Sequence, residues 1–122
     1  MAIILDPDVR RLVDERRSRG QSADIALFVE VLPVHGAGSR VLSATWSSRR
    51  RPAKAWIEQR VGDIVVHMDA RIARYSRWHD IVLSGWRLGP LSRLVVEDEP
   101  LVMMRLLEWL RLHPGVESQP AA

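Results

Sequence analysis

The sequence predicts an α+β fold that is mainly β, and two features of its patterning carry this prediction. Between residues 24 and 98, apolar residues alternate with polar ones in several short runs, which is typical of half-buried strands. The first and last segments instead repeat their apolar residues with a helical period. Since helices do not alternate regularly with the strands, the order does not fit a βαβ protein.

The bulk properties are those of one small globular domain. At 122 residues, with 47% hydrophobic and 27% charged residues, we expect a single domain over residues 1–115 and a flexible tail over 116–122. No apolar run approaches the roughly 20 residues that span a bilayer. The start, MAIILDPDVRR, lacks a basic region, so we expect no secretory signal, no membrane association and a cytoplasmic protein.

Two unusual features of the composition, the lack of cysteine and the excess of arginine over lysine, limit the kinds of site that the chain can form. The chain has no cysteine, which excludes disulfides, thiolate nucleophiles and thiolate metal ligands. Its basic residues are 17 arginines and Lys54, although the net charge is only +3. Arginine suits phosphate and carboxylate recognition, but the same bias arises from codon composition in a GC-rich genome, and we weigh that explanation first.

The first half of the chain predicts a helix followed by a hairpin. Asp6 and Pro7 suit the start of a helix over 6–20, and its last residue, a glycine, suits the end. Two alternating strands follow, over 24–34 and 40–47. The stretch between them, VHGAGSR, is then a seven-residue hairpin loop, rich in glycine because such turns need positive φ. The next segment, SSRRRPAKA, resembles a flexible link.

The second half predicts strands around one short helix and a longer helix at the end. Gly62-Asp63 offers a tight turn before a strand over 64–68, and Asp69 can cap a short helix over 70–78. Strands over 80–89 and 91–98 follow, separated by a Gly-Pro turn. In the C-terminal helix, about 100–113, the apolar residues at i, i+3, i+4 and i+7 are Met103, Leu106, Leu107 and Leu110.

This order resembles the HesB/IscA-type domain, the A-type carrier fold of iron–sulfur cluster biogenesis. IILDPDVRRLVDERRSRG resembles the family's opening strand and helix, LFVEVLPVHGAGSRVLSATWS its central hairpin, and residues 61–98 its later Gly-led strand, aspartate, short helix and closing strand. The resemblance covers about residues 3–98 and implies a small β-sandwich or barrel, with an N-terminal helix, a short inserted helix and, added here, a C-terminal helix.

The family's three cysteine ligands are missing, so the resemblance carries no ligand over to this chain. In the hairpin loop Gly36 falls at or next to the cysteine position, and Gly38 and Arg40 follow. The C-terminal cysteine pair is replaced by the helical segment PLVMMRLLEWLRLHPG. The resemblance therefore implies a domain of carrier shape without the carrier's thiolates, and fold alone does not restore that function.

Histidines and an aspartate give one alternative function. His35, His67, Asp69 and His79 together would make a nitrogen–oxygen metal site. None of the familiar local ligand spacings is present, so we weigh structural histidines first and expect no cofactor, with a metal ion as the alternative.

Basic clusters give a second alternative, a nucleic-acid surface. Arg49, Arg50, Arg51 and Lys54 could bind phosphate, and Trp46 and Trp56 flank them as possible stacking partners. Arg71, Arg74 and Arg77 share one face of the short helix. Solvated basic loops explain the same residues, and we weigh that reading first. Binding of nucleic acid would be strongly salt-dependent.

The interpretation that we favour is a non-catalytic domain that contacts a protein partner or a second copy of this chain. No nucleophile elbow, Walker loop or dinucleotide loop is present, so we do not expect an enzyme. Five tryptophans and many arginines are the residue types that dominate interface hot spots. We expect the interface on the last helix, at Trp109, Met103, Leu106 and Leu110, and a role accessory to iron–sulfur maturation or as a repurposed scaffold.

Overall fold

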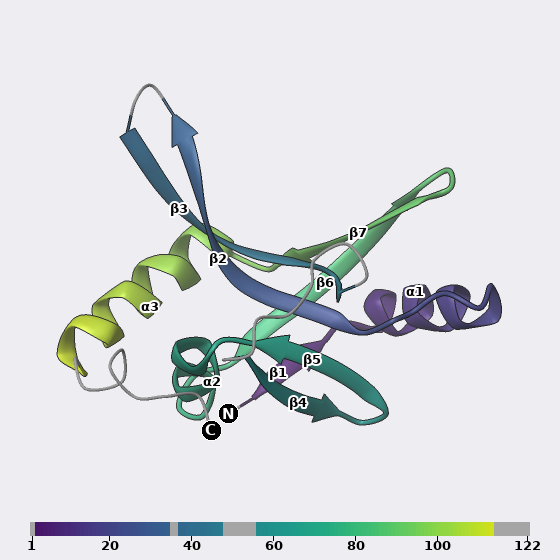
Figure 1. Ribbon diagram of the computed structural model, residues 1–122, viewed down its shortest axis with the longest axis horizontal. Helices are drawn as coiled ribbons and strands as arrows, with labels where there is room; N and C mark the ends of the chain where they lie inside the picture. Colours follow the sequence, from purple (N-terminus) through teal and green to yellow (C-terminus); the bar gives the residue numbers. More distant parts are fainter. Residues whose placement is uncertain (1, 35–36, 48–55, 114–122) are drawn as a thin grey trace.

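The computed structural model describes residues 2–34, 37–47 and 56–113. It contains seven strands and three helices in the order β1 (Ile3–Leu5), α1 (Pro7–Ser18), β2 (Ile25–Val34), β3 (Ala37–Trp46), β4 (Ile57–Val61), β5 (Ile64–Met68), α2 (Ala70–Ser76), β6 (Ile81–Leu88), β7 (Leu91–Val96) and α3 (Glu99–Leu112). The predicted α+β, mainly-β class is confirmed (Figure 1).

The strands form two sheets. One has the order β1-β6-β7 and the other β3-β2-β5-β4. Each sheet joins one parallel pair to antiparallel neighbours: β1 pairs with β6 in parallel, and β2 with β5. The edge strands β3 and β7 lie close together without forming a common ladder. A side-chain bond closes one end of this seam, where the Trp46 indole Nε1–H donates to Ser92 Oγ at 3.1 Å.

One hydrophobic core lies between the sheets and receives side chains from every helix. Its fully buried members include Trp46, Ile64, Ile72 and Leu83, and α3 adds Met103, Leu106 and Leu110. These α3 residues recur at i, i+3 and i+7, so they form one stripe along the helix. The predicted apolar stripe of the last helix is therefore part of the core.

The first helix is fastened to the β4–β5 turn by an ion-pair cluster. Arg10 Nη1 lies 2.7 Å from Asp63 Oδ1, and Arg17 Nη1 lies 2.6 Å from Oδ2 of the same carboxylate. Arg17 also donates to the Asp63 carbonyl oxygen at 2.8 Å. The hydrogen bonds to the Asp63 carboxylate lower its pKa from the ordinary 3.8 to about 2, and the bond from Arg10 has the largest effect, followed by the bond from Arg17.

The start of α2 follows the local sequence signal, whereas the start of α3 is fixed by a tertiary contact. Asp69 caps α2 by accepting from the Ile72 backbone N–H at 3.0 Å, as predicted. Asp98, before α3, takes a left-handed φ of 52° and its side chain makes no capping bond. The neighbouring Glu99 carboxylate instead accepts a hydrogen bond from the Leu42 backbone N–H at 2.9 Å, which joins the start of α3 to edge strand β3.

The predicted seven-residue hairpin loop is wrong. Strands β2 and β3 remain paired as far as Val34 and Ala37, so Gly38 and Arg40 belong to β3. The interstrand backbone hydrogen bonds continue along the hairpin despite the low strand propensity of glycine, because pairing with β2 outweighs that local preference. Gly36 and His35 of the predicted loop lie outside the described residues.

Candidate protein-interaction surface on the C-terminal helix

The helix α3 has a second apolar surface on the side that faces away from the core. Leu101 is 46% exposed, Met104 68% and Leu112 65%, whereas their neighbour Met103 is only 3% exposed. Along the helix, Leu101 and Met104 come before the charged residues of the outer face and Leu112 comes after them. An amphipathic surface helix places polar residues there, so these apolar residues need a reason other than the core.

The charges on this outer face are Arg105, Glu108 and Arg111. Glu108 and Arg111 form an exposed ion pair of 2.6 Å at i and i+3, which contributes little to stability because solvent screens it. Within the described part of the chain, Arg105 has no carboxylate in ion-pair contact. Its guanidinium is therefore available to a group from outside the molecule.

A stack of aromatic rings bounds one side of the outer face. His79 stacks on Tyr75 with ring centroids 4.6 Å apart, Tyr75 meets Trp109 edge-on at 6.0 Å, and Trp109 stacks on His113 at 4.4 Å. His113 Nδ1 also lies 2.8 Å from the Trp109 carbonyl oxygen. Burial raises the pKa of the Tyr75 phenol above its ordinary 10.0, although Arg105 acts in the opposite direction.

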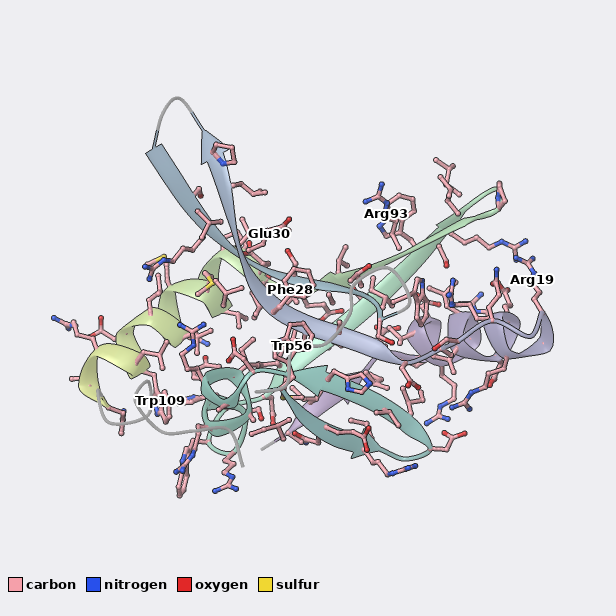
Figure 2. All side chains as sticks on the ribbon, in the orientation of Figure 1. Arg19, Phe28, Glu30, Trp56, Arg93 and Trp109 are labelled. Atoms are coloured by element: carbon pink, nitrogen blue, oxygen red, sulfur yellow. The ribbon has the colours of Figure 1, made fainter. Side chains whose placement is uncertain are left out.

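These features enclose a shallow groove on the outside of α3. The groove has a volume of about 530 Å³, and its lining is mostly apolar. We call this surface the α3 face and define it by its lining residues: His79, Leu101, Met104, Arg105, Glu108, Trp109 and Leu112. Trp109 lies where α3 approaches α2 (Figure 2). Aromatic residues, methionine and arginine are enriched in protein-binding surfaces, and Trp109, Met104 and Arg105 all line this groove.

Only one of the four residues predicted for an interface belongs to the α3 face. Trp109 lies in the groove, but Met103, Leu106 and Leu110 are buried in the core and are not accessible to a partner. The helical period showed that these three residues share one side of the helix, but a side that packs into the core and a side that binds a partner have the same period. The exposed residues Leu101, Met104 and Leu112 carried a sequence signal too, because they are apolar at positions of the polar face.

The residues predicted for a metal site have other contacts. His67 Nε2 lies 3.6 Å from Asp24 Oδ2, Asp69 caps α2 and also accepts from Arg71 at 3.2 Å, and His79 stacks on Tyr75. Among the described residues, no group of three or more histidine, aspartate or glutamate side chains could hold a metal ion. His35 lies outside the described residues, so the metal hypothesis stays a prediction.

The predicted nucleic-acid patch lies mostly beyond the described residues. Arg49, Arg50, Arg51 and Lys54 fall in residues 48–55. The idea that Trp46 stacks on bases is wrong, because Trp46 is fully buried and bonded to Ser92, with the Arg16 guanidinium 4.6 Å from its ring centroid. Trp56 stacks on Phe28 at 6.1 Å, as the labelled rings in Figure 2 show.

Comparisons with known proteins give a likeness in fold only. The sequence matches no protein-family model and no curated protein. The structure is similar to a crystal structure of IscA with a [2Fe-2S] cluster, at a TM-score of 0.49 and 11% identity, covering 77% of this chain and 82% of that one. It is also similar to Escherichia coli SufA, which is involved in biosynthesis of iron–sulfur clusters, at a TM-score of 0.44 and 11% identity, covering 78% of each chain.

Membrane insertion through a helix finds no support in the structure. None of the helices in the described ranges is long and apolar enough to cross a bilayer.

Proposed function

We propose that this chain is a non-catalytic protein-interaction domain that binds through the α3 face and acts as an accessory to iron–sulfur cluster maturation. The observation that carries the proposal is the exposure of Leu101, Met104 and Leu112 on a helix whose opposite side is already in the core. Since the inner stripe anchors α3, these outer residues are not needed to hold the helix in place.

The composition of the α3 face supports a protein as the occupant. Contiguous exposed apolar residues with polar ones around them are typical of interaction sites, whereas scattered single residues are not. The face also contains Trp109 and Arg105, and tryptophan and arginine are among the residue types that contribute most binding energy in interfaces. A bound protein would remove the apolar side chains from water and give Arg105 a carboxylate partner.

A non-catalytic role is supported by the causes of the perturbed pKa values. Asp63 and Tyr75 both have clearly shifted pKa values. The arginine clamp that joins α1 to the β4–β5 turn explains the first shift, and burial explains the second. Both residues therefore have structural explanations, and neither shift requires an active site.

The choice of iron–sulfur maturation rests on the sequence resemblance. The elements that carry it are the opening strand β1 and helix α1, the hairpin β2–β3, the strand β5 that follows Gly62, the Asp69-capped helix α2 and the strand β6. With no cysteine in the sequence, the chain cannot hold a cluster through its own thiolates. In this proposal the chain therefore binds proteins of the maturation system, and the cluster stays bound to those proteins.

Site-specific photo-crosslinking in cells tests the proposal. A photo-crosslinking phenylalanine analogue at position 104 is compared with the same analogue at position 14, an exposed residue of α1 at the far end of the molecule (Figure 1). We expect discrete protein adducts when the analogue is at position 104, and we expect the same adducts to be absent when it is at position 14. Equal adduct patterns from the two positions would overturn the assignment of the α3 face.

Purified proteins then test the specificity of any adduct. We expect the captured protein to bind the chain directly, and Met104→Glu to weaken binding at least tenfold because it places a charge in an apolar groove. Asp14→Lys, a larger charge change at an exposed position of α1, should leave the affinity unchanged. Captured proteins that all lie outside iron–sulfur maturation would overturn that part of the proposal and retain the protein-binding function.

A further inference from the structure

We infer that the α3 face binds a second copy of this chain, with the two α3 helices packed antiparallel across a twofold axis. The inference rests on the proposed function, because it names the occupant that the same surface takes in the isolated protein, which a bound maturation protein would displace. It follows from the arrangement of apolar and charged residues along the outer side of α3.

Two leucines of the α3 face are placed symmetrically about a point near the middle of the helix. Leu101 and Leu112 have their midpoint between Leu106 and Leu107, one residue beyond the centre of α3. Both are exposed, and their helical positions lie on the same side of α3. In a twofold contact each residue that faces another is faced by it in return. An antiparallel pair centred on the midpoint therefore sets Leu101 against Leu112 of the partner subunit at both ends.

The charges are placed symmetrically about the same midpoint and have opposite sign. Arg105 and Glu108 are also equidistant from it, so each Arg105 faces Glu108 of the partner subunit, and the contact occurs twice. A parallel pair in the same register would instead set Arg105 against its own copy, with two like charges at the centre. Like-charge contacts disfavour wrong arrangements, so the charge pattern selects the antiparallel one.

The central ion pairs would be sheltered at their edges. Trp109 follows Arg105 by four residues and lies on the same side of α3, which places its ring beside the guanidinium of the partner's Arg105. An arginine over an indole face is a favourable cation–π contact. Met104 lies on the other side of the outer face, beside Arg111, and covers the pair from there, so the two ends of the contact are apolar and Trp109 and Met104 flank its centre.

The size of α3 predicts a weak dimer. A helix of 14 residues is about 21 Å long, and one face of it buries less than the roughly 800 Å² per partner of a standard stable interface. Small interfaces of this kind are typical of transient complexes. We therefore expect a monomer–dimer equilibrium with a dissociation constant of micromolar order.

Charge reversal with sedimentation equilibrium tests the pairing directly. By symmetry, Arg105→Glu places two Glu–Glu contacts in the interface and Glu108→Arg places two Arg–Arg contacts, so each single change should weaken the dimer at least tenfold. The double variant R105E/E108R restores opposite charges at both sites and should return the dissociation constant to near that of the wild type. Asp14→Arg on α1 is the matched control and should leave it unchanged.

The outcomes separate this inference from the proposed function. A concentration-dependent dimer with rescue in the double variant supports the antiparallel pair, because loss of folding would not be rescued. A monomer at every concentration, or a dimer that neither single reversal weakens, overturns it. If the monomer is nevertheless crosslinked from position 104 to a different protein, the second copy is refuted while the protein-binding function stands.

Discussion

The two adjacent methionines of α3 provide a matched test of which side of the helix faces the core. Met103 is 3% exposed and belongs to the core cluster, whereas Met104 is 68% exposed on the α3 face. Met103→Ala and Met104→Ala are chemically identical changes at consecutive positions of one helix. Their difference in unfolding free energy therefore reports burial and little else.

The expected costs follow from the burial of each side chain. Met103→Ala removes the buried Cγ, Sδ and Cε atoms, which at about 0.8 kcal/mol per buried methylene-sized group costs about 2 kcal/mol. A residual cavity raises the total to about 3 kcal/mol, within the range measured for such changes. Met104→Ala should change the monomer's unfolding free energy by less than about 0.5 kcal/mol, because most of that side chain is already in water.

Urea unfolding followed by tryptophan fluorescence measures both values at protein concentrations where the chain is monomeric. A loss of about 3 kcal/mol also corresponds to a fall in Tm of roughly 10–15 °C for a domain of this size. Equal costs for the two substitutions, or a larger cost for Met104→Ala, would refute the assignment of the inner and outer sides of α3. At high protein concentration Met104→Ala should become destabilising, because it weakens association linked to folding.

Three further predictions concern the rest of the fold. The folded-state pKa of Asp63 is about 2 and its ordinary value is 3.8, so its stabilising contribution is full above about pH 4 and is lost as the pH falls towards 2. In Asp63→Asn, the fall of Tm with decreasing pH between these values should therefore be smaller. An unchanged pH profile of Tm would contradict the ion pairs of Asp63 with Arg10 and Arg17. Gly85→Ala would place a Cβ 2.6 Å from Leu12 Cδ1 and 3.2 Å from the Arg93 carbonyl oxygen. Urea unfolding should show that this substitution lowers the unfolding free energy by about 1–3 kcal/mol. An unchanged unfolding free energy would mean that α1 does not pack so closely on β6. Tyr75 is the only tyrosine, so the rise in near-ultraviolet absorbance that accompanies phenol ionisation reports it alone. Because its pKa is raised, the phenolate should appear above pH 10, and the stability that Tyr75 contributes should be lost as the pH rises through that pKa. Titration at the ordinary value would argue against its burial.

Features that depend on neighbouring residues were predictable from the sequence. The caps at Asp6 and Asp69 and the left-handed glycines Gly20, Gly62 and Gly89 mark helix ends and turns where the sequence places them. Strand partners were not predictable in this way. The parallel pairings of β1 with β6 and of β2 with β5 join distant segments, and alternation along one strand shows which side is buried without indicating which strand lies beside it.

The site was less predictable than the fold because its parts meet only in three dimensions. The apolar stripe of the last helix was visible in the sequence, but the same period serves a core and an interface, so the buried Met103 was assigned to the wrong side. The contact of His67 with Asp24 and the stack of His79 on Tyr75 depend on tertiary packing. Spacing along the chain alone could not distinguish them from metal ligands.

The parallel pairing of the first strand has a consequence for synthesis of the chain. Ile3 pairs with Ile81 and Leu5 with Leu83, so β1 has no partner until most of the protein has left the ribosome. Helix α1 also packs on β6, and its inner residues Val9 and Leu12 stay unburied until then. The segment of β1 and α1 therefore leaves the ribosome well before its partner strand and is among the last parts of the domain to fold, with its apolar residues exposed until β6 is available.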